Sequence, residues 1–271
     1  MPDDKAAFRL RVLSALALVP IALGSVVAGG WIYAAFVGLM AVLMALEWRG
    51  LSDARFGRRW ARLAGGIALG IGLAATLLAA LGRPHESVAC VALGMALAAV
   101  LARTHGSASL WASIGVALVG LPAVALVWLR SVPELGLGLL LWLLIVVWTT
   151  DTAAYVVGRG VGGPRLAPSI SPGKTWSGLG GGVIGAGLAS VITTWALGSE
   201  RLVQFASLGA VFAILAQLGD LAESALKRRA GVKDSGSLIP GHGGVLDRVD
   251  GLLLTAPALA LLVGFNAWQW P

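Results

Sequence analysis

The sequence predicts an all-α polytopic integral membrane protein with about nine transmembrane helices, and three observations support this prediction. Of the 271 residues, 58% are hydrophobic and only 12% are charged, whereas a soluble domain has about 25% charged residues. The apolar residues form repeated blocks close to the length of about 20 residues that spans a bilayer. Because lipid offers no partners to backbone N–H and C=O groups and strand-like alternation is absent, we expect every span to be helical.

Nine apolar blocks mark the expected spans. The first follows a short basic stretch, as in a signal peptide, but it is long and has no clear small-x-small cleavage site, so we expect an uncleaved span. The fourth contains the only cysteine, Cys90, which can form no intrachain disulfide and which we interpret as a small buried hydrophobe. In chain order the blocks cover residues 10–29, 31–47, 64–82, 87–102, 110–129, 135–157, 177–198, 203–226 and 251–269.

The basic residues predict the orientation. If the N-terminus is cytoplasmic, 17 of the 20 lysines and arginines lie on the cytoplasmic side of these spans, and only Arg83, Arg130 and Arg201 lie outside. This distribution follows the positive-inside rule and favours an odd number of spans. The net charge of +7 then follows from the basic residues on the cytoplasmic side of the spans. Without a soluble basic domain to present that charge, a nucleic-acid partner is not expected.

Polar residues are concentrated in the second half of the chain. We interpret residues 1–135 as an N-terminal transmembrane scaffold of about five helices, whose expected spans hold almost no ionisable interior groups. Residues 136–271 would form the C-terminal catalytic region, with the two parts integrated into one membrane domain. From Asp151 onward, polar and glycine-rich clusters recur at each expected cytoplasmic loop. The site is therefore expected there, facing the cytoplasm.

The first polar cluster occupies residues 148–182. It contains Asp151, a carboxylate at membrane depth, which is costly enough to indicate a functional role. The segment SPGKTWSG is similar to a phosphate-binding P-loop, but Pro168 stands where that pattern requires a glycine. We expect the glycines that follow to serve close helix packing. The polar residues just before the next expected helix, whose N-terminus suits an anion, are Ser171, Lys174, Thr175 and Ser177.

The second cluster, GDLAESALKRR, closes the eighth block. Its polar side chains are spaced at i, i+3, i+4 and i+7, so they share one helical face. One interpretation is an internal Asp–Lys and Glu–Lys ladder. Against it, the aspartate lies inside the apolar boundary, where pairing would gain a few tenths of a kcal/mol and desolvation would cost several. The four residues of this face are Asp220, Glu223, Ser224 and Lys227.

The third cluster, IPGHGGVLDRVDG, precedes the last block. Asp247 and Asp250 are three residues apart and would point to one side if this segment is helical. Carboxylates suit Mg²⁺, which uses one or two of them together with substrate phosphates. The glycines would let the backbone approach a ligand closely. His242 would either position a phosphate or cap the turn.

Carboxylates for a divalent cation, together with lysines and arginines for phosphates, indicate phosphoryl or nucleotidyl transfer. A cytosolic nucleotide would reach this face directly, and a lipid would reach it from the leaflet. The residues alone therefore predict a membrane enzyme that handles phosphates with Mg²⁺. An ion-coupled transporter is an alternative, since intramembrane carboxylates and broken helices occur there. Transporters, however, usually have two related halves, and here the polar groups occupy only the second half.

The run from Ser224 to Asp250, SALKRRAGVKDSGSLIPGHGGVLDRVD, resembles the signature of the phosphatidate cytidylyltransferases, or CDP-diacylglycerol synthases, at every position. The upstream elements D-x-x-A-Y-x-x-G at 151–158, SPGKTW-x-G at 171–178 and GDL-x-ES are also present. Before Asp151 the resemblance rests only on hydropathy. It implies a transferase of phospholipid biosynthesis that converts CTP and phosphatidic acid into CDP-diacylglycerol and pyrophosphate.

The resemblance also implies Mg²⁺ as cofactor, in a two-cation site that holds K⁺ as well. The residues that would be catalytic are Asp220, Lys227, Asp247 and Asp250, and the three aspartates would be the metal ligands. Which aspartate bridges the cations is left open. With the residues singled out above, the expected substrate-binding set is Asp151, Ser171, Lys174, Thr175, Ser224, Arg228, Lys233, His242, Gly243, Gly244 and Arg248.

We therefore expect an enzyme of the bacterial cytoplasmic (inner) membrane, with its active site facing the cytoplasm. Its expected partners are CTP, phosphatidic acid and membrane lipids, and a homodimer is compatible with the family. Two alternatives stay open: a cytidylyltransferase or kinase that acts on another membrane lipid, and the ion-coupled transporter.

Overall fold

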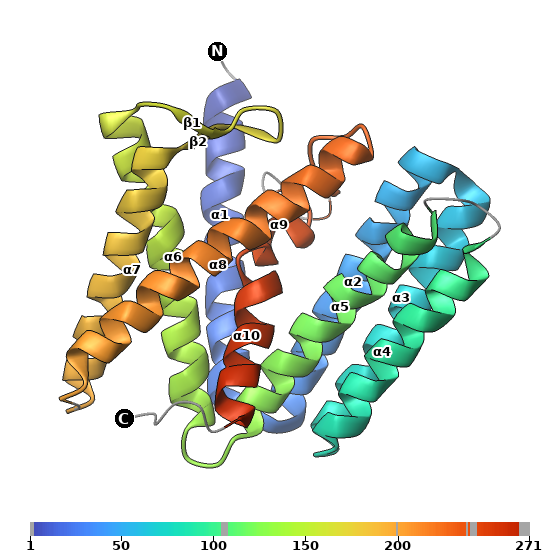
Figure 1. Cartoon of the computed structure of the whole chain (residues 1–271), viewed down its shortest axis with the longest axis horizontal. Coiled ribbons are helices and arrows are strands. Elements are labelled where there is room, and N and C mark those ends of the chain that lie inside the picture. Colours follow the sequence, from blue (N-terminus) through green and yellow to red (C-terminus); the bar gives the residue numbers. More distant parts are fainter. Residues whose placement is uncertain (1–2, 104–107, 199, 237, 239–242, 266–271) are drawn as a thin grey trace. The chain divides into compact units, whose positions relative to one another are not determined.

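The computed structural model describes residues 3–103, 108–198, 200–236, 238 and 243–265 (Figure 1). The described chain is mainly helical, with one short β-hairpin. Its elements are α1 (Asp3–Ala28), α2 (Gly30–Phe56), α3 (Arg58–Ala80), α4 (Pro84–Leu101), α5 (Ala108–Ser131), α6 (Gly136–Val161), β1 (Arg165–Ala167), β2 (Ser171–Thr175), α7 (Trp176–Ala196), α8 (Leu202–Arg229), α9 (Leu246–Val249) and α10 (Leu252–Gly264).

Each of the nine predicted apolar blocks falls on a helix of the described residues, which confirms the all-α polytopic architecture. Seven helices, α2 to α8, are long and apolar enough to cross a membrane. The apolar part of α1, Leu16–Ala28, and α10 are shorter, so the number of spans and their orientation stay predictions. The ninth block extends to residue 269, whereas α10 ends at Gly264 and residues 266–271 lie outside the described part.

The helices expose apolar side chains in continuous stripes. On α7, Ile184, Leu188 and Ile192 recur every four residues and are 65%, 59% and 64% exposed. In water such a stripe would be an unfavourable hydrophobic patch, whereas lipid tails are as apolar as these side chains. The exposed stripes are therefore those of an integral membrane protein.

The chain forms two compact units. The first unit contains Met1–Leu137 and Lys227–Val249, and the second contains Gly138–Leu226 and Asp250–Pro271. The predicted boundary at residue 135 lies close to one of these limits, but Lys227–Val249, which carries most of the signature, groups with the N-terminal helices. The functional division into scaffold and catalytic region stays a prediction.

In the first unit, α2 packs on α3 and α5, and α4 packs on α3 and α5 (Figure 1). Many of the buried positions are small, such as Ala68 and Ala75 of α3, and small residues let helices in a membrane approach closely. The largest buried side chain of α2 is Trp48, whose ring stacks on Trp111 of α5 with 4.7 Å between centroids. Helix α2 is thus held firmly at the end that carries Glu47.

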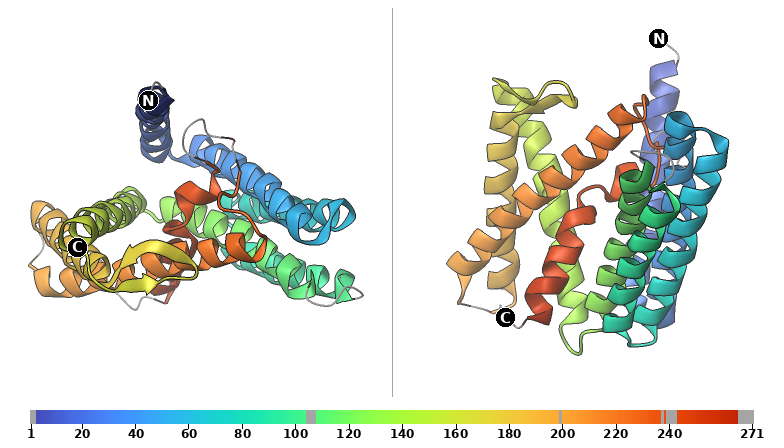
Figure 2. Two further views of the ribbon diagram at one scale, coloured as in Figure 1. Left: turned by 90° about the horizontal axis from the view of Figure 1, so that it is seen from above. Right: turned by 45° about the vertical axis from the view of Figure 1, so that its right-hand side comes forward.

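In the second unit, α6 and α7 pack through the predicted glycines. A Cβ atom on Gly181 would lie 2.5 Å from Val157, and one on Gly185 would lie 2.7 Å from Ala153, which confirms the predicted packing role. The antiparallel hairpin of β1 and β2 connects α6 to α7 (Figure 2). This hairpin was not predicted, and it places Lys174 on a strand rather than in a loop.

Candidate active site

Three carboxylates meet in the second unit. Asp220 and Glu223 are one turn apart on α8, and Asp250 lies in the turn before α10. One oxygen from each lies within 4.8 Å of the others. Glu223 is buried and the two aspartates are half-buried. Oxygen donors grouped in this way suit a hard divalent cation such as Mg²⁺.

The pKa of Asp250 indicates that negative charge dominates around this cluster. Burial and, to a smaller extent, the carboxylates of Asp220 and Asp151 together raise its pKa to about 7, against the opposing effects of the Gly251 N–H and Lys174. Neighbouring like charges in a partly buried site disfavour the ionised form. A cation among these oxygens would remove that repulsion.

Lys174 of β2 contacts the cluster from the hairpin. Its Nζ lies 2.6 Å from Asp220 Oδ2, and Ser224 Oγ lies 3.3 Å from the other oxygen of Asp220, Oδ1. The ion pair of Lys227, four residues further along α8, is made to Asp247. Both of these ion pairs join α8 to other segments, whereas a Glu–Lys contact along α8 stays an open interpretation.

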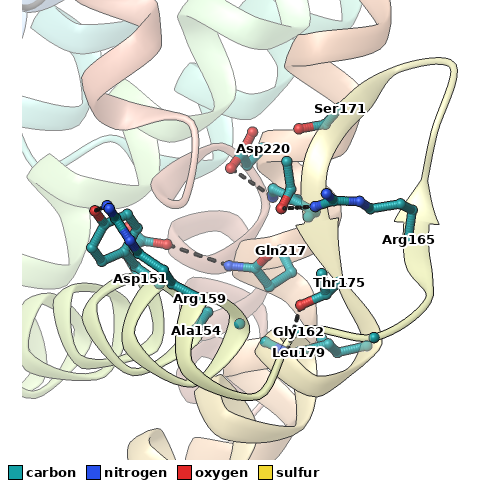
Figure 3. A pocket seen from close by; sticks show the side chains of 16 residues that line it. Asp151, Ala154, Arg159, Gly162, Arg165, Ser171, Thr175, Leu179, Gln217 and Asp220 are labelled. Carbon is teal, nitrogen blue, oxygen red and sulfur yellow. Dashed lines mark hydrogen bonds and ion pairs between the residues drawn. The ribbon is translucent and has the colours of Figure 1, made fainter.

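A cavity of about 680 Å³ opens beside Asp220 and is lined by α6, the hairpin, α7 and α8 (Figure 3). Asp151 and Gln217 lie on one side, where Gln217 Nε2 donates to Asp151 Oδ1 over 3.4 Å. Its cationic lining residues are Arg159, Arg165 and Lys174. Three cations around one cavity suit a ligand with phosphate groups.

Hydroxyls of the segment before α7 make structural contacts, and the substrate-binding role of Ser171 and Thr175 stays a prediction. Ser171 and Thr175 both line the cavity, but the Thr175 hydroxyl is the N-cap of α7 and accepts the Gly178 N–H at 3.0 Å. Ser177 donates to Gly162 O. The hydroxyls of Thr175 and Ser177 therefore hold the start of α7 and connect it to the end of α6, and one helix N–H is already occupied.

Asp247 lies in a second polar cluster, in the first unit. Its Oδ1 pairs with Lys227 Nζ at 2.6 Å, and its Oδ2 accepts from Gly244 N at 2.8 Å. Ser235 adds its backbone N–H at 3.1 Å and its hydroxyl at 3.0 Å. Burial would raise the pKa of Asp247, but the Lys227 ammonium and these hydrogen bonds hold it below its usual value.

Sequence reasoning missed Glu47, a buried carboxylate of α2 in the predicted scaffold. It accepts from Val245 N at 2.6 Å, from Leu246 N at 2.8 Å and from Ser235 Oγ at 3.1 Å. The available signal was an acidic residue at the end of an apolar block, which is costly without a role. Glu223 was noted on its helix face without a metal role. Arg159 and Arg165 were noted only for topology, and Gln217 was not noted.

The remaining predicted site residues do not all lie in the same part of the structure. Helix α9 ends at Val249 and Asp250 lies in the following turn, so Asp247 and Asp250 do not share one continuous helix as the spacing suggested. They belong to different compact units, and a joint role of Asp247 with Asp220 stays a prediction. His242 lies outside the described residues. Exposed cationic residues of the predicted set are Arg228, Lys233 and Arg248.

Gly244 allows the loop to approach α2, and its replacement by alanine is expected to disrupt the second cluster. A Cβ atom there would lie 2.1 Å from Ser235 Oγ and 2.6 Å from Glu47 Oε1. We expect Gly244→Ala to lower the free energy of unfolding by about 1–3 kcal/mol and to reduce turnover, measured by thermal unfolding and initial rates. The control is Gly66→Ala on α3, where a Cβ meets nothing within 4 Å. Equal behaviour of the two variants would contradict this account of Gly244.

Comparison with known proteins identifies close relatives. The sequence pattern of the cytidylyltransferase family matches residues 9–265. A phosphatidate cytidylyltransferase of Brucella suis biovar 1 is 36% identical over 258 residues, which cover 93% of this chain and 91% of the relative. One of Pseudomonas aeruginosa is 36% identical over 276 residues, covering 96% and 98%. One of Haemophilus influenzae is 45% identical over 130 residues, covering 46% and 45%.

Proposed function

The chain belongs to the cytidylyltransferase family, and we propose that it transfers CMP from CTP to phosphatidic acid, giving CDP-diacylglycerol and pyrophosphate. The observation that carries this proposal is the position of Asp220. It belongs both to a cluster of three carboxylates and to the lining of a cavity with three cationic side chains. Such a site would hold a divalent cation beside the phosphates of a nucleotide or lipid.

We propose that Asp220, Glu223 and Asp250 hold Mg²⁺, with Asp247 as a further ligand expected from the signature. The donor set fits, because all its atoms are carboxylate oxygens and the neighbouring carboxylates raise the pKa of Asp250 despite the presence of Lys174. When bound, Mg²⁺ would neutralise charge on phosphate oxygens in the transition state. A second cation, K⁺, stays an expectation from the family resemblance.

The proposed reaction needs no strong base from the protein. The second pKa of a phosphate monoester is about 6, so the phosphate of phosphatidic acid is largely ionised at neutral pH. One of its oxygens would form a bond to the α-phosphorus of CTP, and the bond to the pyrophosphate leaving group would break. The task of Arg159, Arg165 and Lys174 would be to orient the phosphates and neutralise their charge, which is most of the catalysis in such transfers.

A lipid substrate is favoured by the surface next to the cavity. Tyr155 lines the cavity and is 64% exposed, and Trp176 at the start of α7 is 57% exposed. Both residue types are enriched where a membrane meets water. Val156 and Val161 on the same part of α6 are also exposed. We propose that phosphatidic acid reaches the cavity from the cytoplasmic leaflet of the inner membrane, while CTP arrives from the cytoplasm.

The test is an assay of the purified, folded protein with phosphatidic acid, Mg²⁺ and labelled CTP. Labelled CDP-lipid and pyrophosphate are expected in equal amounts, and both should disappear when a chelator removes Mg²⁺. Diacylglycerol and other membrane lipids serve as alternative acceptors. If neither product forms from phosphatidic acid, or if another lipid is a clearly better acceptor, the proposed substrate is wrong.

A further inference from the structure

We propose that Glu47 is a positioning residue for the transfer reaction. It holds the turn Gly244–Asp247 against α2 and thereby fixes the Asp247 carboxylate and its partner Lys227. Glu47, Lys227 and the turn all belong to the first compact unit. The expected loss of kcat/KM rests on the proposed function. The expected loosening of the turn rests on the contacts alone.

The contacts of Glu47 are those of a built acceptor site. Its side chain is buried, with 4% of its surface exposed. Oε1 accepts the N–H of Val245 and Oε2 accepts the N–H of Leu246, over 2.6 and 2.8 Å. Two consecutive backbone N–H groups that point at one carboxylate form an anion-binding concavity. The loop therefore closes around a side chain from a residue almost 200 positions earlier in the chain.

Ser235 connects Glu47 to Asp247. Its hydroxyl lies 3.1 Å from Glu47 Oε2 and 3.0 Å from Asp247 Oδ2. A hydroxyl has one proton to donate, so the two carboxylates share a single donor between them. The Ser235 N–H also donates to Asp247 Oδ2. The position of Asp247 therefore depends on Glu47 through this serine and through the turn.

A second contact of α2 supports the same conclusion. Arg55, two turns after Glu47, donates from its guanidinium to the carbonyl of Arg229 at the end of α8. The guanidinium lies over the rings of Phe56 and Trp111, 5.1 and 5.3 Å from their centroids. Helix α2 thus holds the last turn of α8, which carries Lys227, and the turn that carries Asp247. It fixes both ends of the 2.6 Å ion pair.

The chemistry of the contacts requires a glutamate at position 47. Glutamine would replace one carboxylate oxygen by an NH₂ group, which would face a backbone N–H or the Ser235 hydroxyl without accepting from it. Aspartate is one methylene shorter and would lose contact with the turn. Alanine would leave two buried N–H groups without an acceptor. A general need for polarity at this end of α2 would be met by glutamine or aspartate, whereas positioning of the turn would not.

The experiment compares Glu47→Gln with Ser52→Ala in the full-length protein. Ser52 is buried on the same helix and accepts from Trp111 Nε1, so its loss perturbs the same core without touching the turn. For Glu47→Gln we expect kcat/KM to fall about 10–100-fold, as for residues that orient metal ligands. The amides of Val245 and Leu246 should also exchange hydrogen faster. For Ser52→Ala we expect both quantities to match the wild type.

A double variant distinguishes positioning from a loss of stability. If Glu47 and Ser235 act together on Asp247, Glu47→Gln combined with Ser235→Ala should lose less kcat/KM than the product of the two single losses. Wild-type kcat/KM and amide exchange in Glu47→Gln, or losses that multiply independently, would overturn the proposal. If Glu47→Gln does not fold, Ser235→Ala alone must show the faster exchange and reduced kcat/KM. If the wild type has no transferase activity, the proposed function fails, and the exchange measurement still decides the structural claim.

Discussion

Replacement of Asp220 by asparagine is expected to reduce turnover by about 10³-fold, because charge stabilisation by a bound metal contributes several kcal/mol and each 1.4 kcal/mol is about tenfold. Asp220 is the residue common to the carboxylate cluster and the cationic cavity. The asparagine keeps the size of the side chain but removes a metal ligand and the charge that pairs with Lys174 at 2.6 Å. Initial rates of the purified variant, over a range of Mg²⁺ concentrations, measure the effect.

The variant should still insert and fold, because Asp220 is only half-buried and the Lys174 charge still interacts with the carboxylate of Asp250. Size-exclusion elution and the thermal unfolding midpoint check this. The matched control is Glu86→Gln, at an exposed carboxylate in the first turn of α4, which should turn over at the wild-type rate. A near-wild-type rate for Asp220→Asn would remove Asp220 from the metal site.

Asp247→Asn is expected to abolish most activity and also to lower stability, which separates it from Asp220→Asn. Asp247 and Lys227 form an ion pair with only 8% and 12% of their side-chain surfaces exposed. Removing one member of a buried pair costs about 3–5 kcal/mol, because the other charge is left uncompensated. The asparagine would also lose an oxygen acceptor beside Gly244 N or the Ser235 groups. Turnover and the unfolding midpoint of the inserted protein measure the two effects.

The double variant Asp247→Asn with Lys227→Met provides the control for this second prediction. Removing both charges should restore much of the stability, while turnover stays low because the signature carboxylate and ammonium are both gone. A single Asp247→Asn variant with wild-type stability would contradict the buried ion pair. A double variant that regains turnover would show that neither charge takes part in the reaction.

The helices were predictable because backbone N–H and C=O groups in lipid must pair within the protein, which a helix achieves. Hydropathy located every helix except the short α9, and helical spacing predicted that Asp220, Ser224 and Lys227 share one face of α8, which is helical throughout. The exact ends were less predictable, since α2 continues from Glu47 to Phe56 beyond the apolar block. Polar residues can extend a helix past the bilayer, and hydropathy does not register them.

The sequence singled out Asp220, Asp250 and Lys174 of the candidate site, but not the contacts that these residues make. Spacing suggested that Asp247 and Asp250 share a helix face, but α9 stops after four residues. The role of Glu47 depends on a contact between segments almost 200 residues apart, and neither periodicity nor motif spacing reports such contacts. The β-hairpin was also missed, because its strands have only three and five residues and no clear alternation.

The central claim is that this chain transfers a cytidylyl group to a lipid phosphate, and the fate of two labels tests it most directly. Purified protein is incubated with phosphatidic acid, Mg²⁺ and CTP that carries radioactive phosphorus at either the α or the γ position. We expect the α label in the lipid product and the γ label in pyrophosphate, with one pyrophosphate per modified lipid. A γ label in the lipid would identify a lipid kinase, and no label in the lipid from either CTP would contradict the proposed transfer altogether.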